Sequence, residues 1–284
     1  FDAPDVRIDN VYYEVADVPD TGMERFFSGE LDVYSDIPRE LAGELLRTAP
    51  RAMRVYPTLT VDYLVFNTTK PPFDDPRVRE ALALAIDSQR LVEKALDGGE
   101  IPARRFLPDG LANLREPARP AREGPYPVPR PVSAEENRDR AMEILTNIGL
   151  GARDAWGAGT PIRLILHFNG GETHQKVAEA VAAMWERVGV RADLYSTDYA
   201  VHYGDLGAAD FEVARAGWIA DYNDPAAFLL LFRSTTEKFN YGRFSDPEFD
   251  RLMALAERQP PEARPTILYL SLIHISEPTR LRRI

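Results

Sequence analysis

Asp210 to Pro225 read DFEVARAGWIADYNDP, and this stretch decides how the rest of the chain is interpreted. Its first half is apolar enough for a β-strand in a sheet that other layers cover. Its second half is a polar loop, and Pro225 suits the first position of a following helix. A strand that carries Arg215 and Trp218 to its carboxyl end and then turns at Asp221 is a common way to build a ligand site. The local pattern fits a plain strand with a helix-capping loop more simply, so the other segments must decide.

The composition limits the classes of function. The chain has 284 residues, enough for one large domain or two lobes, and no cysteine, which excludes disulfides, a thiol nucleophile and cysteine-ligated metals. The formal net charge of -11 repels nucleic acid and anionic lipid, so we expect neither as a partner. No apolar run approaches the roughly 18–20 residues of a membrane span, so no direct membrane insertion is expected. The first residues carry no signal-peptide pattern either.

Strand and helix patterns alternate along the chain, which favours an α/β architecture. Residues 102–131 are rich in Pro, Arg and Gly and are expected to be irregular. The expected strands lie in residues 6–15, 31–34, 53–65, 162–168, 190–195 and 210–219, and the expected helices are 21–28, 38–46, one from Pro76 capped by Asp75, one from Ser88 that ends at Gly98, 133–148 with a Ser133–Glu136 capping box, 172–188, a short one near His202, one from Pro225, and 245–258.

The last residues differ from the rest. Residues 271–284 carry three arginines and one glutamate, and they resemble a translated sequencing-adapter read-through. We therefore expect residues 266–284 to be a non-native tail and leave them out of the fold. The alternative is a genuine basic tail. If the tail is spurious, the chain is expected to be truncated at both ends.

Enzyme signatures are absent from the sequence. There is no HExxH, GxSxG or P-loop, and the lone Gly157-Ala158-Gly159 precedes a strand instead of following one. The four histidines are dispersed without metal-ligand spacing, so neither a metal nor a cofactor is expected. Loop carboxylates from Asp205 to Asp224 could form a hydrolase pair, but acidic loop residues are mostly solvated or cap helices.

Several segments together carry a resemblance to a known family. Residues 215–225 look like the ARAGW-x-ADYN-x-P segment of oligopeptide-binding proteins, and residues 67–82 resemble the family's N-x-x-x-PPF-x-D-x-RVR-x-AL element. Residues 27–32 and 240–250 match further family turns and helix signals in the same order. Residues 1–265 therefore resemble the bacterial extracellular solute-binding proteins of family 5, the peptide, oligopeptide and nickel-binding subunits of ABC importers.

The resemblance implies a periplasmic-binding-protein-like α/β fold of type II (class C), with part of lobe 1 and most of lobe 2. Residues 1–65 would form the C-terminal part of lobe 1, and residues 66–265 the second ligand-binding lobe. It implies a non-catalytic, monomeric, periplasmic or otherwise extracytoplasmic protein that binds short peptides between two lobes and delivers them to permease subunits. In this truncated form the chain is expected to bind peptide weakly or not at all.

The resemblance also implies roles for individual residues. Asp221 would take the peptide's ammonium group, and Arg215, assisted by His174, would meet a peptide carboxylate. Trp218 and Tyr199 would be aromatic residues of the cleft wall. Local alternatives are a capping role for Asp221, an internal ion pair for Arg215, and core packing for both aromatics. Leu206 stands where some relatives have another carboxylate-binding arginine, which leaves the peptide length open. The candidate ligand-binding residues are Asp221, Arg215, Trp218, Tyr199, His174, Tyr222 and Asn223.

Two alternatives stay open at this point. The same scaffold could bind another solute, such as a nickel chelate, haem, a sugar or an antibiotic. A chain of another class could be a hydrolase that uses paired loop carboxylates.

Overall fold

The structure is a computed structural model, and the chain divides into two compact units, Phe1–Val55 with Asp97–Gly99 and Tyr56–Leu96 with Glu100–Ile284. Each unit is considered by itself. The residues that the structure describes are 7–14, 19–35, 37–56, 58–96, 100–103, 106–108, 110–111, 133–151, 160–260 and 262–276.

The described part of the smaller unit is helical. Helices α1 (Pro19–Phe27) and α2 (Arg39–Thr48) confirm the two expected helices. The strands expected at residues 6–15 and 31–34 are wrong for the residues described there, which form no strand. Alternating residues form a strand only where another strand pairs with them, and no described segment pairs with residues 7–14 or 31–34.

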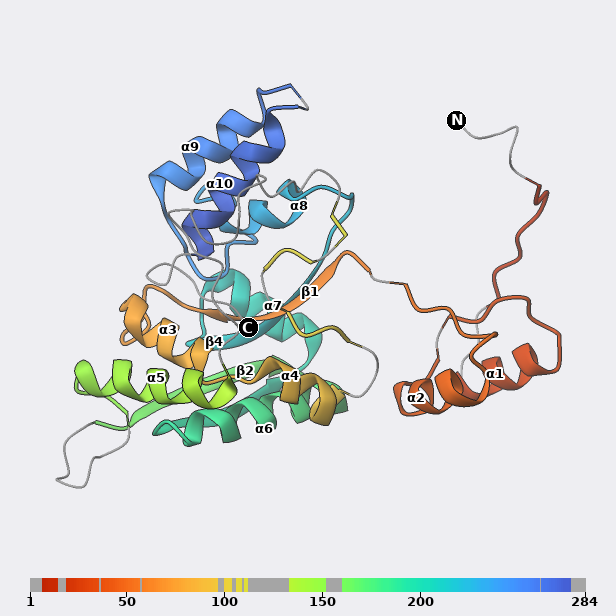
Figure 1. Cartoon of the computed structure of the whole chain (residues 1–284), viewed down its shortest axis with the longest axis horizontal. Coiled ribbons are helices and arrows are strands. Elements are labelled where there is room, and N and C mark those ends of the chain that lie inside the picture. Colours follow the sequence, from red (N-terminus) through yellow and green to blue (C-terminus); the bar gives the residue numbers. More distant parts are fainter. Residues whose placement is uncertain are drawn as a thin grey trace. The chain divides into compact units, whose positions relative to one another are not determined.

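The larger unit is built on one mixed four-stranded sheet (Figure 1). The strand order is β1-β4-β2-β3, with β2 parallel to β3 and β4, and β1 antiparallel to β4. Residues 60–65, assigned from sequence to lobe 1, lie in this sheet, whereas the described residues 53–56 and 58–59 form no strand. The division into lobes at residue 65 stays a prediction. The strands are β1 (Thr60–Phe66), β2 (Ile162–Asn169), β3 (Val190–Thr197) and β4 (Val213–Ile219).

One face of this sheet carries the main hydrophobic core. Alternate residues of β2 are buried, as the two-residue period of a strand requires. Trp185 is fully buried in α6 and donates its indole N–H to the Leu82 carbonyl in α3 at 2.9 Å, which joins two helices of this layer. The layer consists of α3 (Pro76–Leu84), α4 (Ser88–Leu91), the π-helical η2 (Val92–Leu96), α5 (Ala134–Asn147) and α6 (Glu172–Glu186).

Helix starts in this layer follow the sequence signals. The Asp75 side chain accepts a hydrogen bond from the Arg77 N–H at 2.8 Å, which satisfies one free donor of the first turn of α3. Ser133 and Glu136 bond reciprocally at 3.1 and 3.0 Å, so the expected capping box of α5 is confirmed.

The other face is covered by α7 (Tyr199–Ala208), which begins where the Asp198 side chain accepts from the Val201 N–H at 3.0 Å. Leu206 of α7 packs in a smaller core with Ala214 and Ala216 of β4. The small alanines leave room for the Leu206 side chain on this face of the strand.

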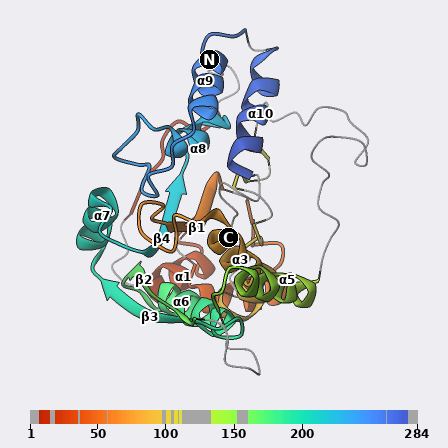
Figure 2. The same cartoon turned by 90° about the vertical axis from the view of Figure 1, so that its left-hand side faces the viewer.

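A third group of helices packs at the end of β1 and β4, where α9 and α10 lie side by side (Figure 2). α9 is capped by Asp246, one residue later than expected, since the Asp246 carboxylate accepts from two N–H groups of its first turn. The group consists of α8 (Ala226–Leu229), η3 (Leu230–Phe232), α9 (Pro247–Ala256) and α10 (Arg264–Ser276).

α10 includes residues that we expected to lie in a tail outside the fold. Leu268 and Leu272 are buried in the core of this helical group, with exposed fractions of 0% and 6%. Residues 266–276 are therefore part of the described structure, and the non-native origin of the tail stays a prediction. The expected irregular segment at 102–131 lies mostly outside the described residues, as does Gly157-Ala158-Gly159.

Candidate functional site

The candidate residues follow the carboxyl ends of three parallel strands. His174 lies just after β2, Tyr199 just after β3, and the segment 221–223 just after β4. Parallel strands end at the same edge of a sheet, which is where open α/β sheets bind ligands. β1 runs in the opposite direction, and its first residues lie opposite the end of β4, so Asp62 pairs with Gly217 at this same edge.

Arg215 of β4 is held by two side chains from neighbouring strands. Its Nη2 donates to the carboxylate of Asp62 on β1, and its Nη1 donates to Oδ1 of Asn169 on β2 at 3.1 Å. The Arg215 side chain is 17% exposed, whereas the Asp62 side chain is 64% exposed. The internal ion pair that the sequence left open for Arg215 is therefore present.

Gly217 provides the space for this ion pair. A Cβ atom at Gly217 would lie 3.0 Å from Oδ1 of Asp62 and 3.1 Å from Nη2 of Arg215. Both distances are tighter than ordinary contacts, so a side chain there would displace the carboxylate or the guanidinium.

His174 joins the same hydrogen-bonded group through Asn169. Its Nδ1 lies 3.1 Å from the Asn169 carbonyl oxygen. A carbonyl oxygen only accepts, so Nδ1 carries the proton and donates it. Asn169 itself is buried, with an exposed fraction of 6%. Arg215, Asn169 and His174 thus form one continuous chain from β4 through β2 to the start of α6.

His202 of α7 supports the same strand from its backbone. Its Nε2 lies 2.8 Å from the Arg215 carbonyl oxygen, and the residue is buried. Burial lowers the pKa of His202, and the charge of Arg215 lowers this pKa further. The ring is therefore neutral at pH 7 with its proton on Nε2, where it donates to β4.

Tyr199 lies in a group of three tyrosines on the α7 side. Its ring is 68% exposed and its centroid lies 4.6 Å from that of Tyr203, which in turn lies 6.2 Å from Tyr241. Burial raises the pKa of Tyr203 and of Tyr241, so both stay neutral phenols at physiological pH. Tyr199 presents an open aromatic surface at the end of β3.

Trp218 packs into the helical group at the end of β4. Its indole N–H donates to the Ala227 carbonyl at 2.6 Å, and its ring meets Phe239 edge to face at 5.3 Å. Both contacts belong to the core around α8, so Trp218 fixes the end of β4 against that helix. These contacts support the core-packing alternative for Trp218.

The loop after β4 exposes Asp221, Tyr222 and Asn223 to solvent. It ends at Asp224, which is buried and binds Arg264 of α10 through both carboxylate oxygens. Asp224 also accepts from the Ala226 N–H at 2.8 Å, so this acid, and not Asp221, has the capping role at α8.

Neither a metal centre nor a spanning helix is found in the described part of the chain. No three or more acidic or histidine side chains lie close enough there to hold a metal ion. The helices described are too short or too polar to cross a bilayer.

Residues 2–240 match the bacterial extracellular solute-binding proteins of family 5, in the middle region of that family. The chain belongs to this family. The earlier resemblance is thereby confirmed, and the α/β fold with it.

Individual relatives agree with this assignment. The periplasmic murein peptide-binding protein MppA of Escherichia coli is 34% identical over 238 residues, which are 83% of this chain and 41% of that protein. The periplasmic oligopeptide-binding protein OppA of Salmonella typhimurium is 34% identical over 239 residues, covering 82% of this chain and 41% of that protein. The solved Escherichia coli murein tripeptide-binding protein MppA aligns with a TM-score of 0.74 at 32% identity over 90% of this chain and 48% of that chain. The chain thus spans less than half the length of these relatives.

Two residues of this hydrogen-bonded group, Asp62 and Asn169, were missed from sequence. Asp62 interrupts the otherwise apolar TVDYLVF of β1, and Arg215 interrupts the apolar VARAGWI of β4. Opposite charges in two apolar strands are a signal for cross-strand pairing, but only the register shows that they meet. Asn169 carried no local signal, because its role depends on where β2 ends relative to β4.

Proposed function

We propose that this solute-binding protein is the substrate-binding component of an ABC importer and that it binds short peptides by their ammonium terminus at Asp221. The two relatives named above are peptide-binding proteins by name. One observation of this chain supports Asp221 as the residue that binds the ammonium group. Of three acids at this edge, Asp62 and Asp224 each bind an arginine, whereas Asp221 pairs with no described residue.

An exposed, unpaired carboxylate suits a ligand's ammonium group. Asp221 has no ion-pair partner among the described residues, so a ligand cation does not have to displace one. Ile219, which is 71% exposed, and the exposed Tyr222 provide apolar surface in the same segment, and Tyr199 provides an exposed ring after β3. Backbone groups of the ligand would pair with strand edges, as extended peptides do in many binding proteins.

In this proposal the protein binds its ligand without catalysing a reaction. It would hold its ligand between a first lobe that includes residues 1–65 and a second lobe of residues 66–265, and pass the ligand unchanged to permease subunits. Its place would be outside the cytoplasmic membrane, in the periplasm or an equivalent compartment. Closure of the two lobes on the peptide would be a hinge motion.

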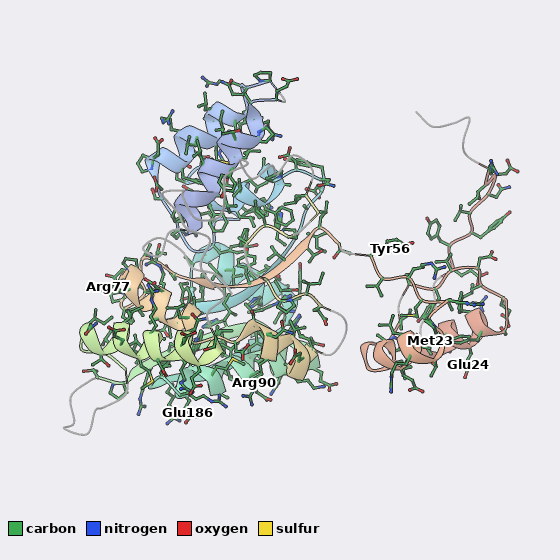
Figure 3. The ribbon with its side chains drawn as sticks, viewed as in Figure 1. Met23, Glu24, Tyr56, Arg77, Arg90 and Glu186 are labelled. Carbon is green, nitrogen blue, oxygen red and sulfur yellow. The ribbon has the colours of Figure 1, made fainter. Side chains whose placement is uncertain are left out.

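The test is calorimetric titration of the protein with a tri- to pentapeptide pool in free and N-acetylated forms. Asp221→Asn removes one charge-assisted interaction, worth about 1.5–3 kcal/mol, or roughly 10- to 150-fold in Kd. We expect this loss for the free peptides only. The matched control is Glu186→Gln, which neutralises an exposed acid at the last residue of α6 (Figure 3).

Three outcomes would contradict the proposal. Equal affinity of Asp221→Asn and the unchanged protein for free peptides would show that Asp221 is not the ammonium anchor. Mass spectrometry of the purified protein that finds a co-purified nickel chelate, haem, sugar or antibiotic in place of peptides would assign the scaffold to another solute. Peptide cleavage during the titration would exclude the non-catalytic role.

A further inference from the structure

Asp62 is the nearest anion to the only arginine of β4. It lies on β1 directly opposite Gly217 of β4. Gly217 is two residues along β4 from Arg215, so Asp62 and Arg215 lie on the same face of the sheet. Its carboxylate receives a hydrogen bond from Arg215 Nη2. Since 64% of the Asp62 side chain is exposed, this carboxylate also faces the space at the edge of the sheet.

The guanidinium of Arg215 is occupied on both of its terminal nitrogens. Nη2 donates to Asp62, and Nη1 donates to the side-chain oxygen of Asn169. The backbone carbonyl of Asn169 in turn accepts a hydrogen bond from His174 Nδ1. Gly217 leaves room for this arrangement, because a Cβ there would press on both Asp62 and Arg215. The arginine therefore has its charge balanced within the protein.

We propose that Asp62 is a specificity-determining residue that acts through Arg215: it neutralises the guanidinium and makes the site prefer ligands that are uncharged or cationic beside β4 over ligands that place a carboxylate there. This inference rests on the proposed peptide-binding function. It names the class of peptide that the same site takes: a carboxamide, or a longer peptide whose terminal carboxylate lies elsewhere.

The physical reason is competition within the protein. The Asp62 carboxylate is tethered next to Arg215, so its effective concentration there exceeds that of any free ligand. A ligand carboxylate must displace it and then lie close to the displaced acid, and two like charges at such a distance repel. A neutral amide or a cation pays neither penalty, and a cation gains attraction from the exposed Asp62 oxygens.

The experiment compares one peptide sequence as free acid and as C-terminal amide. Calorimetry gives the two Kd values for the unchanged protein and for Asp62→Asn. We expect the unchanged protein to bind the amide at least as tightly as the acid. Asp62→Asn frees the guanidinium and is expected to tighten acid binding about tenfold while amide affinity changes less than twofold. Asp62→Glu keeps the charge and is expected to retain the original order.

Asp193→Asn is the matched control. Asp193 is 62% exposed and pairs with Arg191 on β3 at 3.5 Å, so the same charge is removed from an equally exposed strand position. Its ratio of acid to amide affinity is expected to stay unchanged. An equal shift in this variant would mean that net charge alone sets the preference, which would overturn the role of Asp62.

A ligand-free measurement separates the two proposals. Thermal unfolding of Asp62→Asn, Arg215→Gln and the double variant gives the coupling between the two side chains. Additive effects would overturn the inference whatever the peptides do. A second outcome is that the two side chains are coupled and peptides bind, but Asp62→Asn leaves the ratio of acid to amide affinity unchanged. This result would overturn the inference and leave the proposed function standing. Peptide binding is measured in the chain extended to the full length of its relatives; if no variant of that protein binds any peptide, the proposed function fails, and the inference fails with it.

Discussion

The guanidinium of Arg264 in α10 binds both carboxylate oxygens of Asp224, the residue that closes the exposed loop after β4. Arg264 and Asp224 are 40 residues apart in sequence, and their side chains are 25% and 11% exposed. The hydrogen bond to Asp224 raises the pKa of Arg264. α10 therefore fixes one end of the loop that carries Asp221.

Replacing Arg264 with Gln is expected to destabilise the fold. The change removes the cation that pairs with the largely buried Asp224 carboxylate. The loss of one partner from a pair that is partly shielded from water costs about 2–4 kcal/mol of unfolding free energy. Urea unfolding measures this cost. Arg251→Gln is the control, because Arg251 pairs with Glu248 on the surface of α9 and is expected to cost less than about 1 kcal/mol. Equal costs for the two variants would show that the Arg264 pair contributes no more than a surface pair.

Asn67 is expected to be among the most sensitive polar residues. It is fully buried, donates to the carbonyls of Ala209 and Phe211 at 2.9 and 3.1 Å, and accepts from the Thr69 N–H at 3.1 Å. Asn67→Ala leaves buried carbonyls unsatisfied and is expected to cost about 2–4 kcal/mol of unfolding free energy. The exposed Asn147→Ala in α5 serves as control, with an expected change below ~0.5 kcal/mol.

The buried His202 predicts a loss of stability in acid. Its pKa is lowered in the folded protein by burial, whereas in the unfolded chain the imidazole titrates near pH 6.5. The unfolded chain thus binds more protons as pH falls below about 6.5, and the unfolding free energy decreases by at most ~1.4 kcal/mol per pH unit for one proton. His202→Gln retains a donor for the Arg215 carbonyl but does not titrate. We expect its melting temperature to fall less between pH 7.5 and pH 5 than that of the unchanged protein; parallel falls would assign the effect to other groups.

Paired leucine changes test whether α10 belongs to the fold. Leu268 is fully buried and Leu270 is 43% exposed. Leu268→Ala is expected to cost about 2–5 kcal/mol, and Leu270→Ala less than about 0.5 kcal/mol. Leu272→Ala, a change inside the adapter-like segment, is expected to behave like Leu268→Ala. If all three variants unfold at the same denaturant concentration as the unchanged protein, α10 does not pack as described.

Local signals predicted most helices of the larger unit. Asp75, Ser133 and Pro225 mark helix starts, and each is followed by a helix within one residue. These signals work because a cap satisfies free N–H groups a few residues away in sequence. Strands were predicted less well. Residues 7–14 alternate as well as a strand does, yet they form none, because a strand also requires a partner that its own sequence does not specify.

The sequence by itself determined the family, the α/β class and the residues that follow each strand. It could do so because motifs, caps and hydrophobic periods are local. Only the tertiary structure decided which charges are neutralised. Asp62, Asp221 and Asp224 look alike in sequence, but the register of β1 on β4 gives Asp62 to Arg215, and the packing of α10 gives Asp224 to Arg264. Asp221 keeps an unpaired charge among the described residues, because ion pairs depend on distances between segments far apart in the chain.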